Sequence, residues 1–261
     1  MNQNELRRRA GRLASLLPLV VSAALCGWGC SASPTDGDGT KVGYNLLVIV
    51  EKNLDAGSDF LWVRLWRDGE AIAGGRVVVD GDTVTTLPLS GQGSKTYAGS
   101  HWTHGQAVRI TALDSSRAFS YKDSVTLPGA FFITNVSPAN RLWSGGSVVV
   151  EWSPVLGISG FAVLVKPRTS GSSAKGLSVS VGRGETSYTF NRSAFENSYG
   201  QLVADVYDIQ VIGYTPNLLA RPGAAYKQPP TDTPAPIDAP SISGAISSLV
   251  VTARDYIVVP Q

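Results

Sequence analysis

The chain has 261 residues, a formal net charge of +2, 43% hydrophobic residues, 16% charged residues and two cysteines. Two cysteines are too few for a fold built on a disulfide framework. Four of the arginines lie between positions 7 and 12, and the charges of the remaining chain are spread thinly, which excludes a basic nucleic-acid-binding surface.

The N-terminal segment has the pattern of an export signal. The four arginines precede residues 13–25, which carry no charge. The apolar run from residue 13 to residue 29 has seventeen residues, which is short of the roughly 20 that span a bilayer, and Pro18 interrupts it. We therefore expect residues 1–29 to be a cleaved signal peptide. Without them the chain has 18 basic and 19 acidic residues, and a formal net charge of −1.

The end of this segment resembles the signal of bacterial lipoproteins, in which a lipid-modified cysteine becomes the first mature residue. Gly29 precedes Cys30, and residues 30–41 are polar and small enough to form a flexible tether. The resemblance implies a lipid on Cys30 that anchors an exported protein to a membrane of the cell envelope. Ser31 resembles the residue that directs such proteins to the outer membrane.

The lipoprotein pattern is incomplete, and two alternatives stay open. The family has an aliphatic residue and a small residue where this chain has Gly27 and Trp28. Cys26 is a second candidate for lipidation, although Leu25 precedes it directly. Residues 21–24 also offer the small side chains that an ordinary signal peptidase prefers, in which case neither cysteine is lipidated.

Residues 42–129 are predicted to form an immunoglobulin-like β-sandwich. Apolar residues recur with period two, and turn dipeptides such as Asp68-Gly69 and Asp80-Gly81 separate the runs. The stretch 63–79 resembles the strand, turn and strand that open many extracellular immunoglobulin-like modules, a likeness that carries no function. Strands are expected at residues 44–50, 60–66, 76–79, 108–113 and 124–127.

Residues 130–261 resemble a fibronectin type III domain, and we expect a second antiparallel sandwich there. The resemblance implies that Trp152 is a core tryptophan and that Tyr207 packs at a strand corner. Three strands each place apolar residues on one face, as a sandwich core requires. These residues are Val148, Val150 and Trp152, then Phe161, Val163 and Val165, then Tyr207, Ile209 and Val211. The expected strands are 148–152, 158–165, 185–190 and 207–211, with the last at 248–259.

A proline-rich stretch interrupts the second sandwich. Residues 215–243 contain seven prolines, a density typical of an extended, semi-rigid excursion or of a disordered loop. A loop this long inside a compact domain is either functional or a sign that the strand assignment is wrong. The predicted fold class is therefore all-β, with two antiparallel sandwiches after a signal peptide.

One strand has the composition of a contact surface. Leu61, Val63 and Leu65 fall on one face, so Phe60, Trp62, Arg64 and Trp66 fall on the other. If the aliphatic face builds the core, the aromatic face is exposed and Trp62, Arg64 and Trp66 would bind a sugar ring or a peptide. The alternative is that this face is buried beneath another element of the protein.

The sequence contains no recognisable catalytic or metal-binding constellation. His101 and His104 are the two histidines, and a zinc site needs three or four ligands. Residues 171–176 have the spacing of a phosphate loop, but Leu177 stands where that motif needs lysine. We therefore expect no enzyme activity, metal or cofactor.

Two functional interpretations follow. The first is a non-catalytic envelope lipoprotein that acts as a scaffold or adhesion module, with a membrane contact through lipid and an envelope protein or polysaccharide as partner. The second is a carbohydrate- or peptide-binding module that uses the aromatic strand.

Overall fold

The computed structural model describes residues 43–72, 74–117, 119–222, 224, 226 and 242–261. The predicted signal peptide, Cys30 and the tether lie outside these residues. The first half contains β1 (Tyr44–Asn53), β2 (Ser58–Arg67), β3 (Glu70–Ala71), β4 (Arg76–Val79), β5 (Asp82–Thr85), β6 (Gln92–Ala98), β7 (Ala107–Asp114), the short 3₁₀ helix η1 (Ser115–Arg117) and β8 (Phe119–Thr126). The second half contains β9 (Ile133–Ser137), β10 (Val148–Trp152), β11 (Gly160–Pro167), β12 (Leu177–Gly182), β13 (Ser187–Phe190), the 3₁₀ helix η2 (Arg192–Phe195), β14 (Asp205–Thr215), β15 (Ile242–Val251) and β16 (Asp255–Val259).

The prediction of an all-β fold is confirmed. Strands β4 and β10 have the predicted bounds, and the other predicted strands, except the last at 248–259, are found with shifted ends. The predicted strands did not include β3, β5, β6, β9 or β12. Strand β6 is mostly polar, and its backbone is held by pairing with β2, so it depends on its neighbour more than on an apolar pattern of its own. Strand β12 alternates Leu177, Val179 and Val181 with small polar residues, and Val179 and Val181 pack against the main core.

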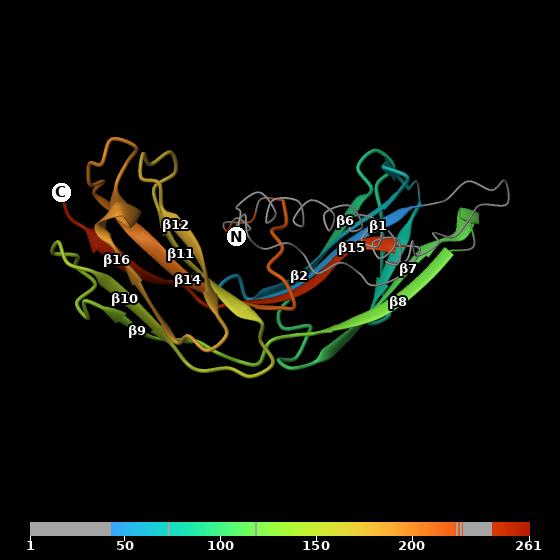
Figure 1. The fold of residues 1–261 in the computed structure, drawn as a ribbon, viewed down its shortest axis with the longest axis horizontal. Helices are drawn as coiled ribbons and strands as arrows, with labels where there is room; N and C mark the ends of the chain where they lie inside the picture. The colour runs from blue at the N-terminus through green and yellow to red at the C-terminus, as the bar shows by residue number, and fades with distance from the viewer. Residues whose placement is uncertain (1–42, 73, 118, 223, 225, 227–241) are drawn as a thin grey trace, which may run out of the picture. The chain divides into compact units, whose positions relative to one another are not determined.

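The strands of the described residues form three sheets. The longest has the order β12-β11-β14-β15-β1-β2-β3, with β16 also paired to β14 and β6 also paired to β2. The order can be followed across Figure 1. A four-stranded sheet, β5-β4-β7-β8, belongs to the first half, and a three-stranded sheet, β13-β10-β9, belongs to the second. The long sheet thus contains strands from both halves of the chain.

Strand β15 joins the two halves. It runs parallel to β1 from the pair Tyr44↔Ile242 to the pair Asn53↔Val251, and antiparallel to β14 over four residue pairs. The strand pairing therefore crosses the predicted domain boundary at residue 129. The parallel pair also departs from the antiparallel arrangement that the sequence predicts.

The single strand predicted at 248–259 is wrong. Two strands, β15 and β16, occupy the end of the chain and lie against different parts of β14. The chain leaves β15 after Val251, because Thr252 turns its backbone N–H toward Val211 and its hydroxyl accepts a hydrogen bond from the Val211 N–H at 3.0 Å. β16 then pairs with the other end of β14.

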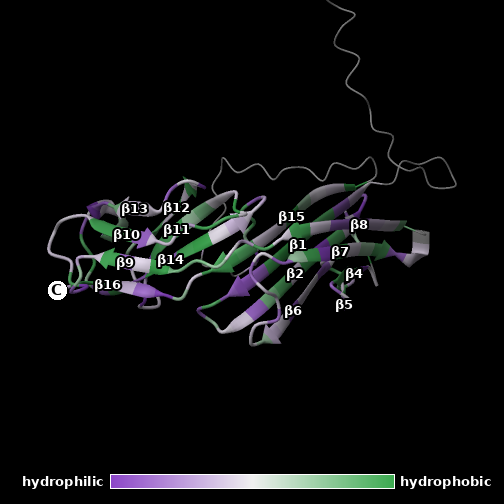
Figure 2. Cartoon of the chain, turned by 90° about the horizontal axis from the view of Figure 1, so that it is seen from below, coloured by the Kyte–Doolittle hydropathy of each residue, from purple (hydrophilic) through white to green (hydrophobic). Residues whose placement is uncertain are grey.

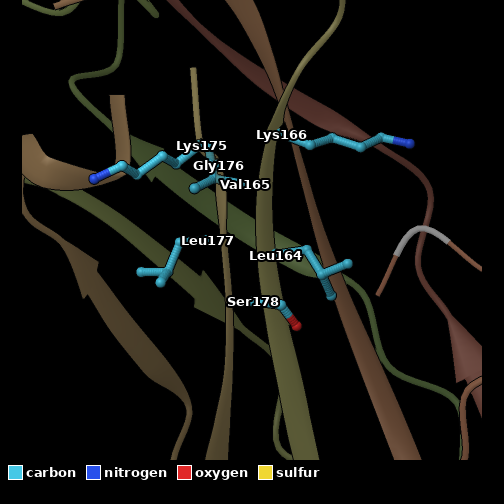
Figure 3. A pocket seen from close by; sticks show the side chains of 7 residues that line it. All are labelled: Leu164, Val165, Lys166, Lys175, Gly176, Leu177 and Ser178. Carbon is cyan, nitrogen blue, oxygen red and sulfur yellow. The ribbon is translucent and has the colours of Figure 1, made fainter. Parts of the chain in front are cut away.

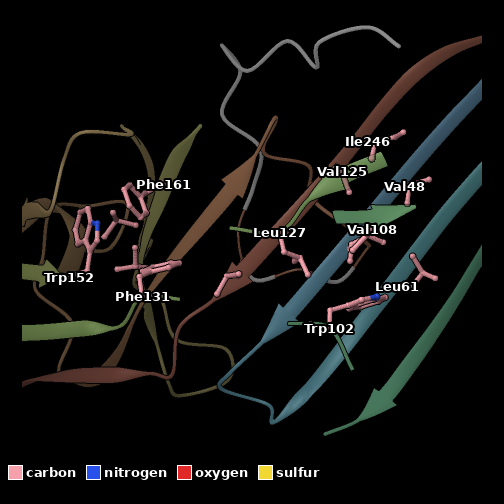
Figure 4. Close-up of a cluster of buried hydrophobic side chains, with 14 of the residues drawn as sticks. Val48, Leu61, Trp102, Val108, Val125, Leu127, Phe131, Trp152, Phe161 and Ile246 are labelled. Atoms are coloured by element: carbon pink, nitrogen blue, oxygen red, sulfur yellow. The ribbon is translucent and has the colours of Figure 1, made fainter. Parts of the chain in front are cut away.

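One face of the long sheet packs against both smaller sheets. The predicted apolar faces of β2, β10, β11 and β14 are all buried in this core, which Figure 4 shows from Val48 and Leu61 to Trp152 and Phe161. Figure 2 shows hydrophobic residues along β10 and β14, interrupted by polar ones such as Glu151 and Asp208 in the sequence. The rings of Trp152 and Phe161 lie 5.2 Å apart, which agrees with the structural role expected for Trp152.

Tyr207 lies in the core with its hydroxyl satisfied by the backbone. The hydroxyl donates to the Val203 carbonyl at 2.7 Å, four residues before it in the chain. Burial raises the pKa of Tyr207 to about 12. The hydrogen bond fixes the approach of the chain into β14, consistent with the corner position that the resemblance implies.

Two predicted turns have the geometry that their sequence favours. Asp68 and Gly69, between β2 and β3, have φ angles of 52° and 84°. Asp80 and Gly81, between β4 and β5, have φ angles of 49° and 92°. Positive φ at both central positions matches the right-handed twist of a hairpin, which explains the Asp-Gly pairs.

The parallel pairing of β15 with β1 depends on a glycine. Gly244 has a φ of 129°, a conformation that side chains with a Cβ rarely adopt, and a Cβ built on it would overlap the carbonyl oxygen of Leu46 on β1. Only glycine allows the two backbones to approach this closely.

Gly244→Ala is expected to lower the free energy of unfolding by about 2 to 3 kcal/mol, because the new methyl group forces β15 away from β1 and strains the backbone. Chemical denaturation followed by tryptophan fluorescence measures this. The matched control is Gly184→Ala, where a Cβ meets no atom within 4 Å. An equal loss of stability in the two variants would contradict the proposed constraint.

Candidate functional site

The second face of the long sheet carries its own buried cluster. On this face β1 and β2 place side chains opposite one another in the pairs Leu47↔Arg64, Ile49↔Trp62 and Glu51↔Phe60. The chain after β14 lies over them, and we refer to its described residues 216–222, 224 and 226 as the covering segment. Leu218, Leu219 and Tyr226 of the covering segment are buried in one cluster with Ile49, Trp62 and residues of β11, β14 and β15.

Hydrogen bonds fix the covering segment to the sheet and to itself. The Ser247 hydroxyl of β15 donates to the Asn217 carbonyl. The Tyr226 hydroxyl donates to the Leu219 carbonyl at 2.9 Å, and burial raises the pKa of Tyr226 well above its ordinary value. This part of the proline-rich stretch is therefore an ordered layer on the sheet.

An ion pair makes the strongest polar contact between the covering segment and the sheet. Arg221 donates from Nε to Glu51 Oε2 at 2.8 Å and from Nη2 to Glu51 Oε1 at 3.3 Å. Glu51 is only 1% exposed, so its carboxylate depends on this two-point contact for compensation of its charge. The hydrogen bond to Glu51 raises the pKa of Arg221.

The aromatic side chains of β2 point away from Leu61, Val63 and Leu65, as predicted, but they form no open aromatic surface. Trp62 is 8% exposed, so the prediction that it is exposed is wrong. The physical reason is the covering segment, whose Leu219 belongs to the same buried cluster as Trp62. The alternative weighed from the sequence, that this face is buried, describes Trp62 correctly.

Phe60 and Trp66 are half-buried, and each has an arginine over its ring. The Arg221 guanidinium carbon lies 4.3 Å from the centre of the Phe60 ring, and that of Arg64 lies 4.8 Å from the Trp66 ring. The indole Nε1 of Trp66 donates to the Ser90 carbonyl at 2.8 Å. The rings that would stack on a sugar are thus engaged within the protein.

A cavity of about 300 Å³ lies between β1, β2 and the covering segment. Its polar lining consists of Arg64, Gln92 and Arg221. Its apolar lining consists of Leu47, Ile49, Trp62, Leu219, Ala220 and Pro222. The cavity brings together two of the three predicted ligand-binding residues, Trp62 and Arg64, while Trp66 does not line it.

Arg64 lines this cavity without a carboxylate partner among the described residues. Its one hydrogen bond among the described residues runs from Nη2 to Asn45 Oδ1 at 3.3 Å, and its Nε is buried without a partner. Burial lowers the pKa of Arg64. Three other arginines with described side chains are similarly half-buried, and each has a carboxylate within 2.8 Å: Arg67 with Asp114, Arg141 with Asp255 and Arg221 with Glu51.

A neighbouring cavity of about 220 Å³ has mostly compensated charges. It is lined by Glu51 and Arg221, which pair with each other, and by Asp55 and Arg254. Arg254 Nε lies 2.7 Å from Asp55 Oδ2. These four charges satisfy one another, whereas Lys166, which also lines the cavity, makes no ion pair among the described residues.

A third cavity, of about 290 Å³, lies along β11 and β12 near the edge of the long sheet. Figure 3 shows Lys166 and Lys175 extending from it in opposite directions. Their ammonium groups therefore do not converge on one point, and the remaining lining consists of small or aliphatic residues. No chemistry is assembled there.

The loop with the two histidines is held by a buried aspartate. Asp59 accepts hydrogen bonds from the backbone N–H groups of His101 and Trp102 at 2.7 and 2.8 Å. His101 lies 3.4 Å from Asp82, and burial lowers the pKa of His104. Within the described residues, no three side chains of His, Cys, Asp or Glu gather into a metal site.

No helix in the described ranges combines the length and the apolar character needed to cross a membrane.

No family model matches the chain. No curated protein matches it either. Among solved structures, the FN1–FN3 domains of chicken CNTN1 align with 82% of this chain at 13% identity and a TM-score of 0.27, and the chain covers 64% of theirs. The D0–D1 domain of intimin aligns with 80% of this chain at 8% identity and a TM-score of 0.25, and 97% of that domain is covered.

A three-domain fragment of titin aligns with 69% of this chain at 15% identity and a TM-score of 0.21, and 58% of the fragment is covered. TM-scores this low do not establish a shared overall topology. The description of the fold and of the site therefore rests on the strands and side chains of this chain.

Two sequence signals pointed to the site but were not used. Glu51 follows Leu47 and Ile49 on the same face of β1, so a buried acid in need of a cation could have been inferred. Leu218, Leu219 and Tyr226 lie in the proline-rich stretch, and large apolar residues favour a packed segment over a solvated loop. Gln92 carried no such signal, because its position follows from the pairing of β6 with β2.

Arg221→Gln is expected to lower the free energy of unfolding by about 3 kcal/mol, because it leaves the Glu51 carboxylate buried without its partner. The double variant Glu51→Gln, Arg221→Gln should recover part of this loss, since no buried charge then remains. Urea denaturation of the three proteins measures both effects.

Arg192→Gln is the matched control. Arg192 also pairs with a glutamate, Glu196, at 2.7 Å, but its side chain is 58% exposed. Removing this exposed ion pair should lower the free energy of unfolding by no more than about 0.5 kcal/mol. If Arg221→Gln is as mild as Arg192→Gln, the ion pair does not hold the covering segment in place.

Proposed function

We propose that the protein is a non-catalytic, lipid-anchored module of the bacterial cell envelope that acts as an interaction scaffold, with Cys30 as the lipidated residue and the outer membrane as its location. Its partner would be an envelope protein or a polysaccharide. A tether at residues 30–41 would hold the folded part away from the membrane surface.

The pairing of β15 with both β1 and β14 carries the scaffold proposal. In a chain of independent domains, a flexible linker lets each domain move by itself. Here ten residue pairs join β15 to β1 and four join it to β14, so backbone hydrogen bonds link the two halves. A scaffold that presents surfaces at a constant spacing benefits from such a link.

The proposal of carbohydrate or peptide binding through an exposed aromatic strand receives no comparable support. Trp62 is buried, and Phe60 and Trp66 are each covered by an arginine. The scaffold interpretation is therefore preferred.

The link through β15 predicts that the protein unfolds in one cooperative transition. Scanning calorimetry should give a single peak, with calorimetric and van't Hoff enthalpies in agreement. Fluorescence and far-UV circular dichroism should report the same midpoint. Two separated transitions would show that the halves unfold as independent domains and would contradict the proposed scaffold.

Lipidation predicts the chemistry of the mature N-terminus. Mass spectrometry of the N-terminal fragment should find Cys30 as the first residue, carrying a diacylglyceryl group. Cys30→Ser should move the protein from the membrane fraction to the soluble fraction after cell lysis, because the acyl chains supply the membrane affinity.

Cys26→Ser is the control, and it should leave the protein in the membrane fraction. An unacylated N-terminus near Ala24 or Leu25 would rule out the lipid anchor. If Cys26→Ser loses membrane association and Cys30→Ser keeps it, the lipidated residue is Cys26 and not Cys30.

A further inference from the structure

The cavity beside Arg64 has at its wall a cation that no described carboxylate compensates. A guanidinium taken partly out of water loses hydration, which a carboxylate partner normally replaces. Arg67, Arg141 and Arg221 follow this rule, whereas the contacts of Arg64 with described residues are one long hydrogen bond to Asn45 and the face of the Trp66 ring, and neither carries a negative charge. A binding partner with negative charge would supply what the described residues do not.

The residues around Arg64 indicate the chemistry of the uncharged part of such a ligand. Glu51, the nearby buried acid of the same face, is already neutralised by Arg221, so it does not compensate Arg64. Leu47, Ile49, Trp62 and Leu219 give the cavity an apolar wall. The side-chain amide of Gln92, which pairs with Arg64 across β2 and β6, also lines the cavity and can donate to an oxygen.

We propose that this cavity is a binding site for a small aliphatic monocarboxylate, with the carboxylate on Arg64 and Gln92 and the hydrocarbon chain against Trp62 and Leu219. A planar carboxylate matches the donor geometry of a guanidinium. A volume of about 300 Å³ is at the lower end of small-molecule sites, so the ligand is a short chain.

The apolar wall selects this ligand class over a sugar acid. A pyranose ring presents hydroxyl groups on its rim, and each would lose its hydrogen bonds to water against Leu47, Ile49 and Leu219. The indole of Trp62 is too covered to stack on a ring face. A methylene chain has no polar groups to satisfy and gains from leaving water.

Octanoate is a suitable probe, and 1-octanol is its neutral counterpart. Isothermal titration of the exported protein, below the micellar concentration of octanoate, should show one site. Octanol should bind at least about tenfold more weakly, because charge-assisted hydrogen bonds are worth about 1.5 to 3 kcal/mol. The brominated analogue 2-bromooctanoate should quench part of the tryptophan fluorescence, and Trp62→Phe should abolish that part.

Arg64→Gln should reduce the affinity for octanoate at least about tenfold and leave that for octanol unchanged. The matched control is Arg183→Gln, which removes an exposed arginine on another part of the chain and should leave binding unchanged. The proposal is overturned if octanoate does not bind, if octanol binds equally well, or if the two arginine variants behave alike.

If Arg64→Gln fails to fold, two measurements still test the proposal in proteins that keep Arg64. These are the comparison of octanoate with octanol and the quenching of Trp62 fluorescence. The outcome is also independent of the lipid anchor, because neither measurement involves Cys30.

Discussion

Strand β15 is the constraint on which the rest of the structure depends. It is an interior strand of the long sheet, hydrogen-bonded to β1 on one side and to β14 on the other. Its two faces also serve two different clusters, with Ile246 and Val250 in the main core and Ala245 and Leu249 under the covering segment. Removing or shifting this strand would therefore expose apolar surface on both faces and break backbone pairing in both halves.

The buried serines of β15 help to fix the place of this strand in the sheet. The Ser248 hydroxyl donates to the carbonyls of Thr126 at 2.7 Å and Thr215 at 3.1 Å, and that of Ser247 donates to the Asn217 carbonyl. Backbone carbonyls that leave a strand ladder need such partners when they are buried. The ends of β8 and β14 are thereby attached to the same strand.

The covering segment is a direct consequence of the topology. The chain must pass from the end of β14 to the start of β15, and the described part of this connection crosses the second face of the sheet. Its apolar residues bury Trp62, and its Arg221 compensates Glu51. The same arrangement leaves Arg64 half-buried beside a cavity whose described lining contains no carboxylate, which is why this face carries the strongest candidate for a ligand site.

Local sequence features determined much of the secondary structure. Alternating apolar residues in β2, β10 and β14 identify the core faces, since side chains of a strand alternate between its two faces whatever its partners. Asp-Gly pairs identify the hairpin turns, because their backbone conformation is favoured locally. The same reasoning could not place β6, whose mostly polar sequence forms a strand through pairing with β2. In β12, Leu177, Val179 and Val181 alternate with small polar residues, a period-two signal that was overlooked.

The sequence by itself determined the all-β class and the core faces, because each depends on composition or on neighbours within a few positions. The export signal at residues 1–29 stays a prediction. Only the tertiary structure decided that β15 pairs in parallel with β1, that Trp62 is covered and that Arg64 has no carboxylate partner among the described residues. The first two depend on contacts between residues more than a hundred positions apart, and an alternating pattern specifies which face of a strand is buried but not which segment buries it.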